Sequence, residues 1–319
     1  MRVVVVGGGS WGSVFAALLA ERGHEVVLAC RDPEQARAIV ATGRNPRYVP
    51  DVDLSGIRAL SLADAPLAEA ELVVVAVPSR AFGEVVRSFP PGEAPVLSLV
   101  KGLDPDTDER LSCLVQGRPA AVLSGPNHAE EIGAGLPAAA VIACVDEALG
   151  LRLQHAVISP RFRVYMNTDV VGVELCAAAK NVIAIGAGAA DGLGMGDNGK
   201  AALVTRGLAE MSRLGEAAGA RPETFAGLAG MGDLIVTCWS RHSRNRRAGE
   251  LIALGASPDE ARATIAMAVE GLTTAPALRD LGRRLRIELP ITEAVCRVLE
   301  GERVREAVGA LMERPPTEE

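Results

Sequence analysis

The stretch Val3-Val4-Val5-Val6-Gly7-Gly8-Gly9-Ser10-Trp11-Gly12 decides the fold of this 319-residue chain. Four β-branched residues favour a buried strand, and the glycines at 7, 9 and 12 form the pattern G-x-G-x-x-G. In this pattern Gly7 permits a tight turn, Gly9 lets the backbone approach a pyrophosphate, and Gly12 lets the next helix pack on the strand. Because a helix N-terminus stabilises an anion, the stretch predicts a dinucleotide-binding strand, turn and helix.

The same stretch also imitates a secretory signal peptide. Residues 3–20 carry no charge, and Arg2 precedes them. A signal peptide leaves the three consecutive glycines unexplained, whereas a strand, a turn and a helix account for every residue. We therefore expect a retained structural element, and we expect no other run that is long and apolar enough to span a bilayer.

Short Val-rich runs alternate with helical patterns through the first half of the chain. This alternation predicts a parallel, doubly wound α/β sheet of the Rossmann type. The expected strands are 3–6, 26–29, 72–77, 96–100, 121–124, 139–144 and 162–167, with helices that include 13–22 and 34–42.

From about Val170 onward the strand pattern disappears. The expected helices are 171–190, 200–218, 224–234, 246–254, 258–268, 275–285, 291–299 and 303–312, followed by a frayed tail over 314–319. The sequence therefore predicts a dinucleotide-binding domain at 1–170 and an all-helical substrate and catalytic domain at 171–319.

Composition excludes several classes of function. The net charge of −7 and the pI near 5.3 argue against a general nucleic-acid surface. The six cysteines form no C-x-x-C pair and the four histidines no H-x-x-x-H spacing, so we expect no metal site. We interpret the cysteines as reduced thiols of a cytoplasmic protein.

Lysine is rare in this chain: only Lys101, Lys180 and Lys200 stand among 33 lysines and arginines. A lysine can titrate when buried and can transfer a proton, whereas an arginine cannot. A retained lysine therefore marks a position where arginine does not serve. The alternative is that genome composition or heat adaptation left three accidental lysines, and this alternative is strongest for Lys200.

Two further groups are candidates for the chemistry. Asp233 lies on the Gly-rich turn that starts at Gly230, where it either orients Lys180 or caps a helix. Ser243, Arg244 and Asn245 can hold a phosphate together with helix-start amides, or they form a solvated basic face.

The end of the second strand indicates which dinucleotide is used. Arg31 takes the first position after that strand and can pair with a 2′-phosphate, whereas Asp32 can bind a ribose 2′-hydroxyl or cap the next helix. We expect NADP to be favoured, with NAD also used.

Taken together, these segments resemble the bacterial-type NAD(P)-dependent glycerol-3-phosphate dehydrogenases over essentially the whole chain. The resemblance is carried by the segments 174–188, 194–201, 230–234, 237–245, Ser124-Gly125-Pro126 and Val269-Glu270-Gly271. It implies interconversion of dihydroxyacetone phosphate and sn-glycerol 3-phosphate by hydride transfer with NAD(P)H, which supplies phospholipid synthesis.

The resemblance also implies residue roles. Lys180 would donate and accept the proton, with Asp233 and Lys101 beside it. The residues implied to surround the substrate are Lys101, Gly125, Asn127, Lys180, Asp233, Ser243, Arg244 and Asn245. Those implied to line the dinucleotide, besides the three glycines, are Ser10, Trp11, Arg31, Tyr48, Lys101, Ala129, Arg244 and Glu270.

This chain departs from the family pattern after Pro126. The family usually reads Ser-Gly-Pro-Ser/Thr-Phe-Ala, whereas this chain has Asn127 and His128. An asparagine can still donate and accept hydrogen bonds at that position. His128 adds a titratable group near the expected cofactor.

Two other functions stay open from the sequence. A related two-domain dehydrogenase of a hydroxyacid or sugar acid would share the nucleotide domain and the lysine, but it needs a carboxylate site in place of 243–245. A dinucleotide-sensing protein without turnover would share the fold. An apolar helical domain is also compatible with a homodimer.

Overall fold

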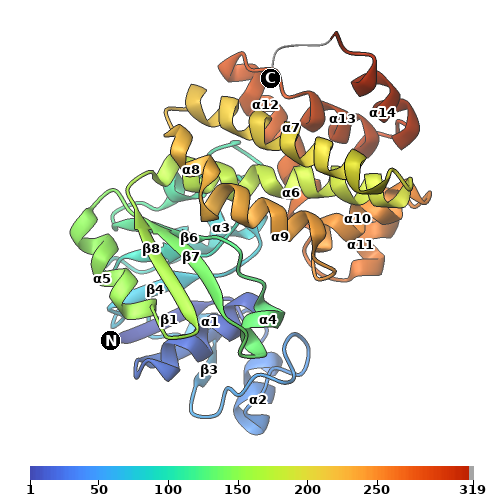
Figure 1. Cartoon of the computed structure of the whole chain (residues 1–319). Helices are drawn as coiled ribbons and strands as arrows, with labels where there is room; N and C mark the ends of the chain where they lie inside the picture. Colours follow the sequence, from blue (N-terminus) through green and yellow to red (C-terminus); the bar gives the residue numbers. More distant parts are fainter. Residues whose placement is uncertain (316–319) are drawn as a thin grey trace. The chain divides into compact units, whose positions relative to one another are not determined.

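The computed structural model describes residues 1–315, and these form two compact units (Figure 1). The first unit comprises residues 1–101 and 109–173, and the second comprises 102–108 and the chain from Glu174 onward. The sequence pattern predicted one boundary after residue 170, and it carried no signal that 102–108 belong with the helices. Residues 316–319 of the expected frayed tail lie outside the described residues.

The first unit contains an eight-stranded sheet. Its strands are β1 Arg2–Val6, β2 Glu25–Cys30, β3 Arg58–Ser61, β4 Leu72–Val75, β5 Val96–Ser98, β6 Ala120–Ser124, β7 Ala138–Ala143 and β8 Phe162–Asn167. Their order is β3-β2-β1-β4-β5-β6-β7-β8. The order reverses between β1 and β4, which is where open α/β sheets bind ligands at the carboxyl ends of their strands.

Helices cover this sheet on both faces. They are α1 Ser10–Glu21, α2 Pro33–Thr42, α3 Ser79–Arg87, α4 Ala129–Gly133 and α5 Glu147–Val157, with short 3₁₀ turns at Leu62–Asp64 and Leu111–Leu114. Alternate residues of β1 enter different apolar clusters, Val3 and Val5 on one face and Val4 and Val6 on the other. A strand buried on both faces explains the unbroken run of valines.

Two features of the sheet differ from the prediction. Strand β7 pairs antiparallel to β6, so β7 and β8 run against the other strands. Strand β3 was not predicted, because its four residues begin with the exposed Arg58 and lack a Val-rich run. It pairs parallel to β2 at the edge of the sheet.

The second unit is helical. Its elements are α6 Val170–Gly192, α7 Gly196–Ala217, α8 Pro222–Ala226, the π-helix η3 Leu228–Gly232, α9 Asp233–Trp239, α10 Arg244–Ala253, α11 Pro258–Ile265, α12 Glu270–Leu285, α13 Pro290–Leu299 and α14 Val304–Met312. The expectation that no other run is long and apolar enough to span a bilayer was wrong, because helix α6 has that length and composition. It is, however, almost entirely buried inside the protein. It is therefore the core helix of this unit and not a membrane span.

One predicted helix is divided in the structure. The sequence predicted a single helix over 224–234, whereas α8 ends at Ala226, a π-helical turn follows, and α9 starts at Asp233. Glycines at 227, 230 and 232 favour this interruption, because glycine is a weak helix former. A Cβ at Gly230 would lie 2.1 Å from the carbonyl oxygen of Phe225, so the chain also needs glycine there for close packing.

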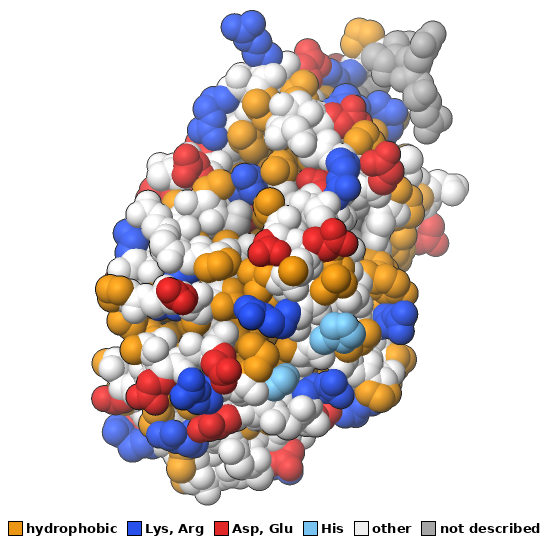
Figure 2. Space-filling view, turned by 90° about the vertical axis from the view of Figure 1, so that its left-hand side faces the viewer, with side chains coloured by type: hydrophobic (Ala, Val, Ile, Leu, Met, Phe, Trp, Pro, Cys, Tyr) orange, Lys and Arg blue, Asp and Glu red, His pale blue; other side chains and the backbone are white. Residues whose placement is uncertain are grey.

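Basic and acidic side chains are interspersed on the face of the molecule that Figure 2 displays. Any anion site on that face therefore depends on local groups and not on an extended cationic field.

A buried carboxylate ties α7 to the start of α13. The oxygens of Glu210 accept hydrogen bonds from the backbone amides of Ile291 at 2.7 Å and Thr292 at 3.0 Å, and from the Thr292 hydroxyl at 2.6 Å. Burial raises the pKa of Glu210, and these hydrogen bonds oppose the rise. Glu210 therefore acts as a helix cap supplied from a distant part of the chain.

We expect Glu210→Gln to change how stability depends on pH. The folded state binds the Glu210 proton more tightly than the unfolded chain does, so the contribution of this group is fully present below its ordinary pKa of 4.5. It is lost as pH rises through the raised pKa. The wild type should therefore lose stability relative to Glu210→Gln as pH increases, measured by urea unfolding between about pH 4 and 8.

The control for this experiment is Glu84→Gln on α3, where the side chain is exposed. Its stability should differ from that of the wild type by an amount that does not change with pH. The same constant difference for Glu210→Gln would contradict the account.

Candidate functional site

The glycine-rich turn after β1 has the geometry of an anion cradle. Gly7 has φ of +120°, and a Cβ there would lie 2.4 Å from the carbonyl oxygen of Ala76. A Cβ on Gly12 would lie 1.9 Å from the carbonyl oxygen of Gly7. Gly9, the N-cap of α1, has open space where its Cβ would be. The turn therefore needs glycine for close packing at two positions and leaves room for a ligand at the third.

Polar atoms without partners lie at the same helix start. The Ser10 hydroxyl oxygen and the Trp11 Nε1 are buried and have no hydrogen-bond partner among the described residues. Helix α1 has no acidic residue in its first turn, and its glycine N-cap provides no side-chain cap. Buried polar groups normally find partners, so these groups fit a dinucleotide whose phosphates would lie at the helix N-terminus.

Asn45 supports this turn, and the sequence analysis missed it. It is fully buried, and its Nδ2 donates to the carbonyl oxygen of Gly8 at 2.9 Å and to the Ser13 hydroxyl at 2.8 Å. The Asn45-Pro46 pair marked a turn in the sequence. Nothing in the sequence indicated that this turn contacts a loop 37 residues away.

The two residues after β2 have different surroundings. The Asp32 carboxylate caps α2, accepting from the Glu34 amide at 3.0 Å, which is the role expected if it does not bind ribose. Arg31 is exposed, and no described residue forms an ion pair or hydrogen bond with its side chain. A free guanidinium at this position is compatible with a 2′-phosphate.

Lys101, Gly125 and Asn127 meet beyond the carboxyl ends of β5 and β6. The Lys101 ammonium donates to the Gly125 carbonyl oxygen at 3.0 Å and to the Asn127 Oδ1 at 2.6 Å. The Asn127 Nδ2 is buried without a partner among the described residues. Asn127 therefore accepts from the lysine with one end of its amide and can donate to a ligand with the other.

The remaining positions expected near the dinucleotide belong to different elements. Ala129 starts α4 and is buried, and His128 is its N-cap. Tyr48 is half-buried in the loop after α2, with the Arg47 guanidinium 5.3 Å from the centre of its ring. Glu270 starts α12 in the helical unit.

The helical unit contains a buried lysine–carboxylate pair. Lys180 lies in the middle of α6, and its Nζ donates to Asp233 Oδ1 at 2.8 Å and to Thr237 Oγ1 at 2.7 Å. The side chains of Lys180 and Asp233 are 5% and 2% exposed. Asp233 opens α9 and Thr237 follows one turn later, so both face the same lysine. The sequence indicated Lys180 and Asp233 as candidates for the chemistry, whereas Thr237 only began the segment 237–245 that resembles the family and had no role of its own.

The surroundings of this pair are dry. Burial raises the pKa of the neighbouring Cys238 thiol to about 12, although the Lys180 charge acts against that rise. The thiol therefore stays protonated and does not compete with Asp233 for the ammonium. Removing one member of a buried ion pair typically costs about 3–5 kcal/mol, because the other charge loses its compensation.

An asparagine bridge connects three helices next to this pair. The Asn245 Nδ2 donates to Asn181 Oδ1 at 2.8 Å, and the Gly271 amide donates to Asn245 Oδ1 at 2.9 Å. Asn181 follows Lys180 in α6, whereas Asn245 follows Arg244 in α10. The bridge therefore holds the backbone of the lysine segment against that of the basic cluster and the start of α12.

The basic cluster begins at a capped helix start. The Ser243 hydroxyl oxygen accepts from the Arg246 amide at 3.2 Å and caps α10. Arg244 is exposed and forms no ion pair or hydrogen bond with a described residue. The cluster thus presents an uncommitted guanidinium at a helix N-terminus, which is a suitable place for a phosphate.

Comparison with known proteins places these features in one family. The sequence profile of the N-terminus of NAD-dependent glycerol-3-phosphate dehydrogenase matches residues 2–150, and the C-terminal profile of the same enzyme matches residues 169–309. A glycerol-3-phosphate dehydrogenase (NAD(P)+) from Moorella thermoacetica is 48% identical over 99% of this chain and 97% of its own length. One from Nocardia farcinica is 46% identical over 98% of each chain.

A solved structure agrees with the sequence comparisons. The crystal structure of glycerol-3-phosphate dehydrogenase from Coxiella burnetii matches with a TM-score of 0.94 and 37% identity, over 98% of this chain and 99% of that one. The sheet unit and the helical unit therefore match the same kind of enzyme, both in sequence and in structure. This chain belongs to the bacterial-type NAD(P)-dependent glycerol-3-phosphate dehydrogenases.

Proposed function

We propose that this protein interconverts dihydroxyacetone phosphate and sn-glycerol 3-phosphate with NAD(P)H. The observation that carries the proposal is the buried ammonium of Lys180, held by Asp233 and Thr237 in the same unit as the free Arg244. Family membership supports the same reaction. Reduction of a ketone needs a proton donor at its oxygen and a means of holding the rest of the substrate.

The reduced nicotinamide, when bound, supplies the hydride for the carbonyl carbon. Lys180 stabilises the oxygen that becomes negative and gives it a proton, and it takes that proton back in the reverse direction. Asp233 and Thr237 accept hydrogen bonds from the ammonium and so orient it. Lys180 returns to its charged form by taking a proton from water.

The substrate phosphate is assigned to Arg244 with the Ser243 hydroxyl and the amides that start α10. Contacts with the unreactive phosphate hold the substrate so that its carbonyl is correctly positioned. Binding energy at the phosphate therefore also lowers the barrier to reaction. In the sheet unit Lys101, Gly125 and Asn127 are assigned to the substrate, and Lys101 also to the dinucleotide. Both ends of the Asn245 amide are hydrogen-bonded to protein, which supports a positioning role beside any direct contact with substrate.

We also propose three features of the enzyme in the cell. NADP is the favoured cofactor, since Arg31 is free and Asp32 caps α2. The enzyme works in the cytoplasm, in keeping with six free thiols, and supplies glycerol phosphate for phospholipid synthesis. It acts as a homodimer, a state compatible with its apolar helical unit. The first test is an assay of dihydroxyacetone phosphate reduction with NADH and NADPH side by side.

Replacing Lys180 should abolish turnover. In Lys180→Met the buried Asp233 loses its partner, so that variant is expected to be unstable. The double variant Lys180→Met/Asp233→Asn removes both charges and should fold, bind NADPH with nearly wild-type affinity, and reduce dihydroxyacetone phosphate at least about 100-fold more slowly. Stopped-flow kinetics and fluorescence titration measure these quantities. Turnover within tenfold of the wild type would refute the role of Lys180.

Replacing Arg244 should mainly weaken substrate binding. We expect Arg244→Met to raise KM for dihydroxyacetone phosphate about 10- to 100-fold, the loss typical of a charge-assisted hydrogen bond. Arg247→Met is the matched control, because Arg247 lies on the same helix, is half-exposed and pairs with Glu250. Equal, small effects of both substitutions would identify the basic cluster as a solvated face.

Replacing Arg31 should change the choice of cofactor. Arg31→Ala removes the only group assigned to the 2′-phosphate, so KM for NADPH should rise about tenfold or more while KM for NADH changes little. Steady-state kinetics with the two cofactors give this ratio. A parallel rise in both values would place Arg31 at a part of the dinucleotide that the two cofactors share.

A further inference from the structure

A second buried lysine holds the far end of α6. Lys200, in the first turns of α7, donates from Nζ to both carboxylate oxygens of Asp191, at 2.9 and 2.8 Å. The Lys200 side chain is 7% exposed. Asp191 lies in the last turn of α6, the helix that carries Lys180. The pair therefore joins the C-terminal end of α6 to the start of α7.

The same carboxylate also holds the start of α10. Arg246 Nη1 donates to Asp191 Oδ2 at 2.6 Å, and Arg246 Nε donates to the carbonyl oxygen of Ser240 at 3.4 Å. Arg246 lies two residues after Arg244. The carboxylate thus holds the first turn of α10 through Arg246, and Arg246 in turn holds the loop that leads into this helix.

The ammonium of Lys200 reaches the end of α9 as well. It lies 5.0 Å from the centre of the Trp239 ring, close enough for a cation–π interaction. Trp239 is the last residue of α9, the helix that begins with Asp233. The segment from Asp233 to Arg246 is therefore held near its middle and at its end by a single group of charges.

Backbone packing makes this placement sensitive. A Cβ at Gly188 in α6 would lie 1.8 Å from the carbonyl oxygen of Arg246, and one at Gly249 in α10 would lie 1.9 Å from that of Ile185. The two helices therefore meet backbone to backbone. At such a contact a small shift of α10 would displace Arg244 relative to Lys180.

We propose that Lys200, Asp191 and Arg246 form a positioning cluster that fixes Ser243 and Arg244 relative to Lys180. None of the three is assigned to contact the reacting atoms. The proposal rests on the proposed function, because it takes Arg244 to bind the substrate phosphate. It also accounts for lysine at position 200 in an arginine-rich chain. A compact ammonium can meet both oxygens of Asp191 and the ring of Trp239, whereas a planar guanidinium has a different reach.

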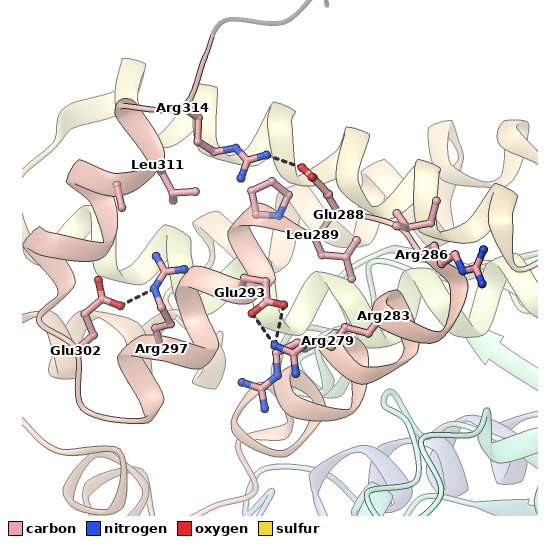
Figure 3. Close-up of a pocket in the computed structure, with 13 residues that line it drawn as sticks. Arg279, Arg283, Arg286, Glu288, Leu289, Glu293, Arg297, Glu302, Leu311 and Arg314 are labelled. Atoms are coloured by element: carbon pink, nitrogen blue, oxygen red, sulfur yellow. Dashed lines mark hydrogen bonds and ion pairs between the residues drawn. The ribbon is translucent and has the colours of Figure 1, made fainter.

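Another charged cluster of this unit offers a matched control. A cavity of about 550 Å³ is lined by residues of α12, α13 and α14, with Arg283 facing Glu293 and Arg297 facing Glu302 (Figure 3). Each of these two arginines is paired with a carboxylate of the cavity lining, and neither is assigned to the reaction. Arg297→Met therefore removes a partly buried ion pair of the same unit without touching the positioning cluster.

The experiment compares substrates with and without a phosphate. We expect Lys200→Met to lower kcat/KM for dihydroxyacetone phosphate about 10- to 100-fold, mainly through KM, because displaced positioning groups cost rates of this order. For unphosphorylated dihydroxyacetone, kcat/KM should stay within about twofold of the wild type, as should KM for NADPH. Arg297→Met should leave all three values unchanged.

Two outcomes would overturn the positioning cluster. One is an unchanged KM for dihydroxyacetone phosphate in Lys200→Met, and the other is an equal loss with both substrates, which indicates general destabilisation. If Lys200→Met does not fold, Lys200→Arg keeps the positive charge opposite Asp191 and should fold with a raised KM. A wild-type KM in that variant would equally overturn the proposal.

The variant Arg244→Met separates this proposal from the one on which it rests. If Arg244→Met is impaired and Lys200→Met is not, only the positioning cluster is wrong. If Arg244→Met itself binds dihydroxyacetone phosphate normally, the phosphate assignment is wrong.

Discussion

A lysine ammonium that is buried away from water needs a carboxylate or other hydrogen-bond acceptor beside it. This requirement determines how the helices around Lys180 pack. Lys180 is held by Asp233 and Thr237, which come from a helix more than fifty residues later in the chain. Each of these groups would be costly to bury alone. The hydrogen bonds among them therefore hold α9 against α6. The hydrogen bonds between Asn181 and Asn245 and between Asn245 and Gly271 connect α6 to α10 and α12 in the same way. The result is an ammonium whose direction is set before any substrate binds, which is the condition for effective electrostatic catalysis.

The two units are proposed to have different roles, the sheet unit in binding the dinucleotide and the helical unit in proton transfer and phosphate binding. The sheet unit offers backbone amides at the start of α1 and open space at Gly9, which suit the phosphates of a dinucleotide. The helical unit offers a proton on Lys180 and an uncommitted guanidinium on Arg244. In the sheet unit two buried groups proposed to meet ligands, the Ser10 hydroxyl and the Asn127 Nδ2, have no hydrogen-bond partner among the described residues. Asn45, which supports the same turn, has protein partners at both ends of its amide, because its Nδ2 donates to Gly8 and Ser13 and its Oδ1 accepts from Gln35.

Local patterns in the sequence predicted the elements whose cause is local. The valine run and glycines of 3–12 specify the first strand, turn and helix, and the scarcity of lysine indicates Lys180 as a candidate proton donor. What the sequence did not reveal depends on contacts between distant segments. Thr237 and Asn45 look like ordinary polar residues until the fold brings them to Lys180 and Gly8. The reversal of β7 also depends on pairing with a distant strand, because the direction of a strand leaves no mark on its periodicity. The π-helical turn before Asp233 has a local cause in its glycines, but these interrupt the helical pattern too weakly to have been recognised in the sequence.

In the proposed mechanism Lys180 protonates the oxygen of the substrate carbon that receives the hydride. The most direct measurement is a crystal structure of the wild-type protein with NADPH and glycerol 3-phosphate. If Lys180 has this role, its Nζ should lie within hydrogen-bond distance of the substrate C2 oxygen, at about 2.6–3.2 Å, with the phosphate at Arg244 and the start of α10. A C2 oxygen held by other groups, with the Lys180 ammonium still enclosed by protein alone, would contradict it.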